Sequence, residues 1–133
     1  MNYLLDTHYM LWALTDTQKL SKKIKDVITD TENRIMISAV SFWEVSLKAS
    51  IGKLELVGFS PEDLPDACSQ MGFDIVPLGA GETSSYHNLV ATYHKDPFDR
   101  MLIWLAMRND YTFISADNHV KKYVSEGLRI FAS

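Results

Sequence analysis

The stretch that decides the fold is Tyr3-Leu4-Leu5-Asp6-Thr7-His8, in which an apolar run ends on a carboxylate and a helical pattern follows. A short apolar run bounded by polar residues is typical of a buried strand. Residues 2–6 are therefore predicted to form the first strand, and residues 7–14 the first helix. The same order of strand and helix recurs along the chain, which is the pattern of a parallel sheet covered on both faces.

Along the rest of the chain, the same pattern predicts four more strands and six more helices. The strands are expected at residues 34–37, 73–78, 111–115 and 128–131. The helices are expected at 21–29 with Ser21 as cap, at 41–50 with Ser41 as cap and Gly52 as stop, from Ser60 onward, and at 82–93, 98–108 and 118–124. The helix at 98–108 is apolar nearly all round, so we expect it to be buried between layers. The fold class is α/β, a three-layer domain with a parallel sheet of about five strands.

Length and composition fit one compact unit. The 133 residues predict a single domain over 1–133, and a hydrophobic content of 47% is sufficient for one core. The lone cysteine, Cys68, excludes an internal disulfide framework and is expected to be a buried, inert thiol. The N-terminus has no apolar signal segment, and no stretch approaches the ~20 apolar residues of a membrane span. We therefore expect a cytoplasmic protein with no membrane partner.

The charge balance bears on possible substrates. The net charge is −4 and the isoelectric point is near 5.5, which argues against a broad basic surface for nucleic acid. However, divalent ions bound to some of the 17 acidic residues would cancel much of that charge locally. Net charge alone therefore does not exclude a polyanionic substrate.

Four acids hold the positions at which an active site would form. Asp6 and Asp117 each follow a predicted strand, Glu44 follows the strand at 34–37 after a short turn, and Asp99 opens the apolar helix. In an open parallel sheet, ligands bind at the carboxyl ends of the strands. Carboxylates that meet there repel one another unless a hard cation neutralises them. The arrangement predicts an enzyme that uses Mg²⁺ or Mn²⁺ and acts on phosphoesters.

Each acid also has a purely structural alternative. Asp6 and Asp117 can cap the helices that follow them, and Glu44 can form an exposed ion pair with Lys48 one turn later. Asp96 and Asp99 bracket one helix start, and both cannot be its cap. Capping alone does not comfortably explain all four positions, so we infer function from the set rather than from any single acid.

Longer motifs surround these acids and resemble a known family. They are Leu4-Leu5-Asp6-Thr7-His8, Ser38-Ala39-Val40-Ser41-Phe42-Trp43-Glu44-Val45-Ser46-Leu47-Lys48, Gly52-Lys53-Leu54 and His94-Lys95-Asp96-Pro97-Phe98-Asp99-Arg100-Met101-Leu102-Ile103. From residue 3 to about residue 124 the chain resembles a PIN-domain ribonuclease, and within that family a VapC-type toxin of a bacterial toxin–antitoxin pair. Carried over residue by residue, the family's acidic quartet falls on Asp6, Glu44, Asp99 and Asp117. Where such proteins often have Thr near the last acid, this chain has Ser115, which keeps the hydroxyl.

The resemblance implies a Mg²⁺-dependent endoribonuclease with a Rossmann-like sheet in the order 3-2-1-4-5. It also implies a homodimer and a small antitoxin whose tail covers the acidic site. Asp6, Asp99 and Asp117 are expected to contact the metal, while Glu44 orients the attacking water or holds a second ion. Two alternatives remain. One is a catalytically silent module that binds metal or RNA, and the other is a structure-specific DNA nuclease of the same superfamily.

Residues around the quartet have less specific expectations. Thr7 and Ser115 satisfy local backbone groups or contact the water shell of the metal. Lys48 and Arg100 form ordinary salt bridges to neighbouring acids or meet a phosphate. His8 and His94 are expected to line the wall of the site, and Trp12, Trp43 and Trp104 are expected in the core. A two-fold interface is expected to include part of the surface formed by the helix at 21–28 and by Leu54, Leu56, Phe59 and Leu64.

Overall fold

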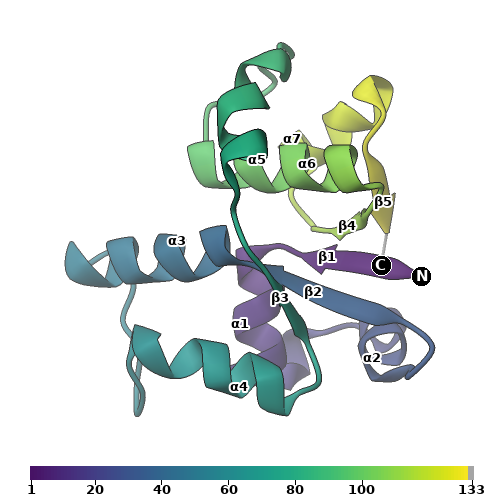
Figure 1. Cartoon of the computed structure of the whole chain (residues 1–133). Helices are drawn as coiled ribbons and strands as arrows, with labels where there is room; N and C mark the ends of the chain where they lie inside the picture. Colours follow the sequence, from purple (N-terminus) through teal and green to yellow (C-terminus); the bar gives the residue numbers. More distant parts are fainter. Residues whose placement is uncertain (132–133) are drawn as a thin grey trace.

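The computed structural model describes residues 1–131 and contains a five-stranded, all-parallel sheet in the order β3-β2-β1-β4-β5. This confirms both the α/β fold class and the predicted strand order. The strands are β1 (Asn2–Leu5), β2 (Arg34–Ser38), β3 (Asp74–Val76), β4 (Thr112–Ile114) and β5 (Arg129–Phe131). β1 lies at the centre of the sheet, between strands from distant parts of the chain (Figure 1).

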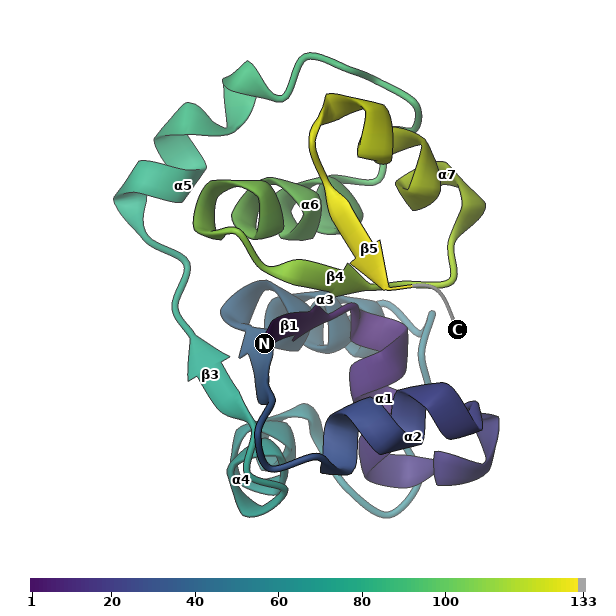
Figure 2. The same ribbon diagram turned by 90° about the vertical axis from the view of Figure 1, so that its right-hand side faces the viewer.

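Helices cover both faces of the sheet, which gives the three layers that the sequence predicts. The α-helices are α1 (Thr7–Thr15), α2 (Lys22–Thr29), α3 (Ala39–Ser50), α4 (Leu64–Gln70), α5 (Ala80–Ser85), α6 (Pro97–Asn109) and α7 (Asn118–Lys121). Residues 1–131 also contain four 3₁₀ turns: η1 (Thr17–Lys19), η2 (Pro61–Asp63), η3 (Tyr86–Asn88) and η4 (Lys122–Glu126). Helices α1, α2 and α4 lie on one side, α5, α6 and α7 lie on the other, and α3 extends away from the end of β2 (Figures 1 and 2).

Alternation along the strands divides the core into two layers. In β1, Tyr3 and Leu5 pack with the side chains of α1, α2 and α4, whereas Leu4 packs with those of α6 and η4. Successive side chains of a strand point to opposite faces, so a strand in the middle of a three-layer fold is apolar at consecutive positions. Cys68 is fully buried in the first layer, and burial raises the pKa of its thiol to about 11, which makes it unreactive.

The start of α3 differs from its prediction. Ser38, not Ser41, is the N-cap, and its hydroxyl accepts a hydrogen bond from the backbone N–H of Val40 at 3.0 Å. Ser41 is instead a buried residue inside the helix. The helix ends as predicted, with Gly52 just beyond it at φ +74°, a backbone conformation that glycine adopts without steric cost.

The predicted helix at 82–93 is wrong in extent. Helix α5 ends at Ser85, η3 adds one tight turn to Asn88, and the chain then runs irregularly to α6. Ser85 accepts hydrogen bonds from the indole N–H of Trp104 at 3.0 Å and from Arg108 at 2.7 Å. These contacts fix the end of α5 on α6, so tertiary contacts override the local helical pattern.

The register of the sheet places the acidic residues at one edge. Leu5 pairs with Ile114, and the backbone N–H of Asp6 donates to the carbonyl of Ile114 at 3.1 Å. Asp6 and the residues after β4 therefore leave the sheet side by side. Within residues 1–131, no helix has the length and apolar character needed to cross a bilayer.

Candidate active site

A cleft of about 300 Å³ lies at the carboxyl edge of β1 and β4, and three of the four predicted acids line it. Asp6 comes from the β1–α1 junction, Asp99 from the first turn of α6 and Asp117 from the start of α7. The remaining lining residues are His8, Tyr9, Trp12 and Ala116. Acids separated by more than a hundred residues in the chain thus share one hollow.

Two of these acids are also helix caps. Oδ1 of Asp6 accepts from the backbone N–H of Tyr9 at 2.8 Å, and Oδ1 of Asp117 accepts from that of His119 at 2.7 Å. The capping alternative is therefore correct for both residues. Each cap uses one oxygen of a carboxylate that also lines the cleft, so a capping role and a role in the cleft are compatible.

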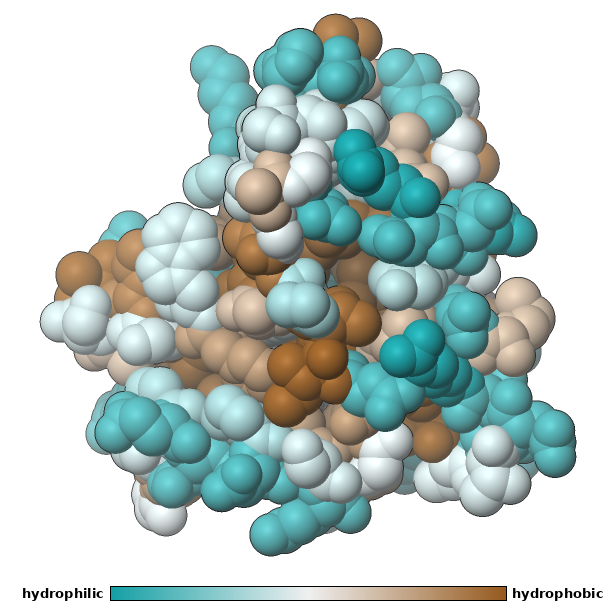
Figure 3. All heavy atoms as spheres, in the orientation of Figure 1, coloured by the Kyte–Doolittle hydropathy of each residue, from teal (hydrophilic) through white to brown (hydrophobic). Residues whose placement is uncertain are grey.

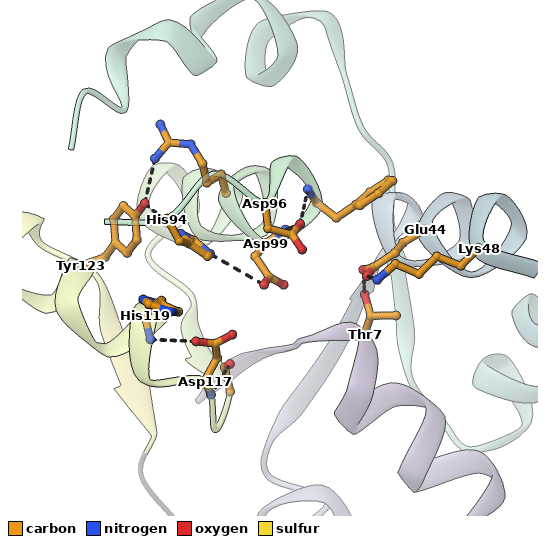
Figure 4. A network of polar contacts seen from close by, with 12 residues as sticks. Thr7, Glu44, Lys48, His94, Asp96, Asp99, Asp117, His119 and Tyr123 are labelled. Carbon is orange, nitrogen blue, oxygen red and sulfur yellow. Dashed lines mark hydrogen bonds and ion pairs between the residues drawn. The ribbon is translucent and has the colours of Figure 1, made fainter. Parts of the chain in front are cut away.

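Asp99 has no such structural role. The cap of α6 is Asp96, whose Oδ1 accepts from the backbone N–H groups of Phe98 and Asp99 at 2.9 and 3.1 Å. The Asp99 side chain is only 22% exposed and lies among other acids (Figure 4). Burial raises its pKa to about 7, with further contributions from the negative charges of Asp96, Glu44, Asp6 and Asp117.

Asp6 shows the same crowding of negative charge. Burial raises the pKa of its carboxyl, and the charge of Glu44 acts in the same direction. The backbone N–H of Tyr9, the hydroxyl of Ser115 and the charge of His8 oppose this shift. Ser115 also accepts from the backbone N–H of Asp117 at 3.2 Å, which confirms the expectation that it satisfies a local backbone group.

Glu44 lies beside the cleft rather than in it. It lines a small hollow of about 60 Å³ that shares His8 with the larger cleft. Its Oε1 accepts from the hydroxyl of Thr7 at 2.6 Å, and its Oε2 is paired with Lys48 (Figure 4). The hydroxyl of Thr7 therefore contacts side chains and not the local backbone groups that one of its two alternatives predicted. The salt-bridge alternative for Lys48 is correct.

The PIN domain family matches the sequence over residues 3–125. The chain belongs to the PIN domain family. A comparison with curated protein sequences found no match.

Solved structures show the same fold as this PIN domain. VapBC2 from Rickettsia felis, bound to a DNA fragment from its promoter, aligns with a TM-score of 0.67 at 16% identity, over 98% of each chain. VapBC-1 from nontypeable Haemophilus influenzae aligns with a TM-score of 0.68 at 14% identity, over 98% of this chain and 97% of the other. FitAcB from Neisseria gonorrhoeae aligns with a TM-score of 0.63 at 17% identity, over 98% and 96%.

A buried arginine and a tyrosine form a polar network behind the cleft of the PIN domain. Arg100 donates to the hydroxyls of Tyr86 and Tyr123 at 2.8 and 2.7 Å, and to the carbonyls of Leu89 and Ala91 at 2.7 and 2.6 Å. The two alternatives given for Arg100 are therefore both wrong. Its acceptors are neutral oxygens, and its guanidinium is buried away from the surface that a phosphate would reach.

The network continues to Asp99 through His94. The hydroxyl of Tyr123 lies 3.1 Å from Nδ1 of His94, and Nε2 of His94 lies 3.7 Å from Oδ2 of Asp99 (Figure 4). When the hydroxyl of Tyr123 donates to Nδ1, a neutral imidazole carries its proton on Nε2, which faces Asp99. Burial lowers the pKa of His94, which favours that neutral form.

Sequence reasoning did not single out Tyr123. The residue is fully buried, yet it lies in a short 3₁₀ turn where no periodic pattern marks it. The available signal was Arg100, because an arginine on an apolar helix requires buried acceptors. Trp43 was wrongly predicted to be core: it is 59% exposed and packs edge-on against Phe98, with ring centroids 5.1 Å apart.

The residues of the cleft fit a hard divalent cation. The three aspartates offer carboxylate oxygens, the ligands that Mg²⁺ and Mn²⁺ prefer. Burial is the main cause of the raised pKa of Asp99, and the neighbouring negative charges, which a bound cation would offset, add to it. Within residues 1–131, no three acidic, histidine or cysteine side chains are grouped tightly enough to hold an ion as they stand.

Proposed function

We propose that this PIN domain is a Mg²⁺-dependent endoribonuclease and the toxin of a toxin–antitoxin pair, with Asp6, Asp99 and Asp117 as metal ligands. The observation that carries the proposal is the cleft in which these three aspartates converge, with the pKa of Asp99 raised to about 7. Strongly shifted carboxylates in a cleft are typical of catalytic sites. Membership of the PIN family and the VapBC and FitAcB likenesses support the same function.

In this proposal, hydrogen bonds from the backbone fix the orientation of two of the carboxylates that bind the cation. The backbone N–H groups of Tyr9 and His119 fix one oxygen of Asp6 and of Asp117, which leaves the other oxygen for the cation. The imidazole of His94 lies next to Asp99, with Nε2 3.7 Å from Oδ2. When bound, the Mg²⁺ ion supplies charge stabilisation for the phosphate and an activated water.

Cleavage by the purified protein tests this function. With single-stranded RNA and Mg²⁺ we expect internal cleavage that EDTA abolishes and that Mn²⁺ supports. Asp99→Asn and Asp6→Asn should reduce the rate at least ~100-fold, since each removes a metal ligand. Asp66→Asn is the matched control, because Asp66 is exposed on α4 and distant in sequence from every acid of the cleft.

Two results would favour the alternatives. Mn²⁺ binding without cleavage of any RNA would indicate a silent binding module. Cleavage of branched or flapped DNA in preference to RNA would indicate the structure-specific DNA nuclease. Equal RNA cleavage by the wild-type protein and the Asp99→Asn variant would contradict the proposed active site itself.

We also propose that the protein has a cognate antitoxin, in line with its likeness to VapBC and FitAcB. A cleft lined by three carboxylates attracts a cationic side chain, and an arginine can pair with two carboxylates at once. The antitoxin would thus inhibit by placing a basic residue of a flexible tail where the cation binds. Mutation of that residue to alanine should weaken inhibition, while the antitoxin should keep part of its affinity for the protein.

We propose that the protein forms a homodimer, through an interface that does not include Leu64. Leu64 is buried in the core at 1% exposure and cannot belong to an interface. The segment 54–59 remains partly exposed, and Val57 within it is 82% exposed. Hydrophobic side chains also gather over the end of α3 and over β3 (Figure 3). Light scattering at micromolar concentration should give twice the 15.1 kDa mass of the chain, and a monomer would contradict the proposal.

A further inference from the structure

Glu44 differs from the three aspartates because both of its carboxylate oxygens already have partners. Oε1 accepts from Thr7 at 2.6 Å, and Oε2 is paired with the ammonium group of Lys48, one helical turn further along α3. The hydroxyl of Thr7 is held in turn 3.0 Å from that of Ser41. The side chain of Glu44 is 5% exposed, so little water reaches its carboxylate.

Lys48 is held in place from more than one side. Its Nζ lies 5.9 Å from the centroid of the Phe98 ring, and its side chain is only one-third exposed. Burial acts to lower the pKa of Lys48, but the hydrogen bond and charge of Glu44, with the charges of Asp96 and Asp99, outweigh this and raise it. Lys48 is therefore a fixed positive charge at the Glu44 carboxylate, in the small hollow beside the cleft (Figure 4).

We propose that Lys48 is the resident counter-ion of Glu44, so that the cleft takes a single divalent ion and Glu44 positions Lys48 instead of ligating metal. A second ion on Glu44 would have to displace the ammonium group from Oε2 and would then lie next to it. Two positive charges so close together repel each other. Glu44 and Lys48 together carry no net charge. The ligand charge at the cleft thus comes from the three aspartates.

This inference rests on the proposed metal-dependent function, and a binding cycle in the absence of RNA separates the two. Mn²⁺ is titrated into the wild-type protein and into Asp99→Asn, Glu44→Gln, Lys48→Met and the Glu44→Gln/Lys48→Met double variant, with free Mn²⁺ followed by electron paramagnetic resonance. Circular dichroism and thermal melts in EDTA check that each variant folds. The Lys48→Met change keeps the apolar stem of the side chain and removes its charge.

The single changes should act in opposite directions. Glu44→Gln leaves Lys48 uncompensated and should weaken Mn²⁺ binding about tenfold, whereas Lys48→Met should strengthen it about tenfold. The double variant should bind one Mn²⁺ within about threefold of the wild-type affinity, because the net charge beside the cleft is then restored.

The outcomes discriminate clearly. Two Mn²⁺ ions on the wild-type protein, or a double variant as weak as Glu44→Gln alone, would show that Glu44 is a ligand and would overturn the inference. No Mn²⁺ binding by the wild-type protein, or equal binding by Asp99→Asn, would instead overturn the proposed function. A single ion with opposite single effects that cancel in the double variant supports both.

Discussion

The charge of Asp99 should destabilise the metal-free fold, and Asp99→Asn should remove that cost. The pKa of this carboxyl rises from 3.8 to about 7 on folding, because the group is buried among other acids. Each pKa unit corresponds to about 1.4 kcal/mol, so ionising Asp99 in the folded protein costs at most about 4 kcal/mol. Since partial solvent access reduces this value, we expect a gain of about 2 kcal/mol for Asp99→Asn above pH 7.

The sign of the effect depends on pH. A carboxyl whose folded pKa is raised binds more protons in the folded state, so it lowers the free energy of unfolding as pH rises from about 4 through 7. At pH 4–5 the wild-type residue is largely protonated in the fold, and Asp99→Asn should change little. At pH 8 the melting temperature of the variant should exceed that of the wild type by about 8 °C.

The assay is thermal unfolding in EDTA at pH 5 and pH 8, followed by circular dichroism. Asp66→Asn, an exposed residue with the same chemical change, should shift the melting temperature by less than about 2 °C at both values. Added Mg²⁺ should raise the melting temperature of the wild type and leave Asp99→Asn nearly unchanged. A lower melting temperature for Asp99→Asn at pH 8, or an equal gain at both pH values, would refute the reasoning.

Three further predictions follow from the contacts described above. Tyr123→Phe removes an acceptor from buried Arg100 and the hydrogen-bond partner of His94 Nδ1, so it should lower the free energy of unfolding by about 1–3 kcal/mol. Tyr93→Phe loses only an exposed contact and should lower it by less than about 0.5 kcal/mol; urea unfolding measures both. Ser38→Ala should cost about 1 kcal/mol in the same assay, because α3 loses its cap. Inhibition by the antitoxin should weaken as Mg²⁺ is raised in an RNA cleavage assay, and inhibition indifferent to Mg²⁺ would place its contact outside the cleft.

The approximate positions of the five strands could be predicted from the sequence because each strand has its own local signal. Buried parallel strands are short apolar runs, and the helices between them carry caps and polar faces. The positions of Asp6 and Asp117 follow from the same rule, since Asp6 comes directly after β1 and Asp117 comes three residues after the end of β4. The strand order, by contrast, came from the family resemblance, because local patterns do not determine which strands become neighbours.

The remaining features depend on contacts that no local pattern reveals. Ser38 and Ser41 are equally good caps by composition, and only the end of β2 decides between them. The end of α5 is set by its contacts with α6. The pairing of Glu44 with Thr7 required β1 and α3 to meet, and the buried environment of Arg100 required the loop before α6 to fold over it.

The central position of β1 has a consequence for the synthesis of the protein. β1 leaves the ribosome long before one of its neighbours, β4, which begins only at Thr112. Until then, one edge of β1 has no strand partner, and Asp6 lacks both Asp99 and Asp117. A nascent or prematurely terminated chain thus lacks the complete cleft, while its open strand edge is a template for aggregation. The order of the strands therefore delays the cleft until Asp117 has been made.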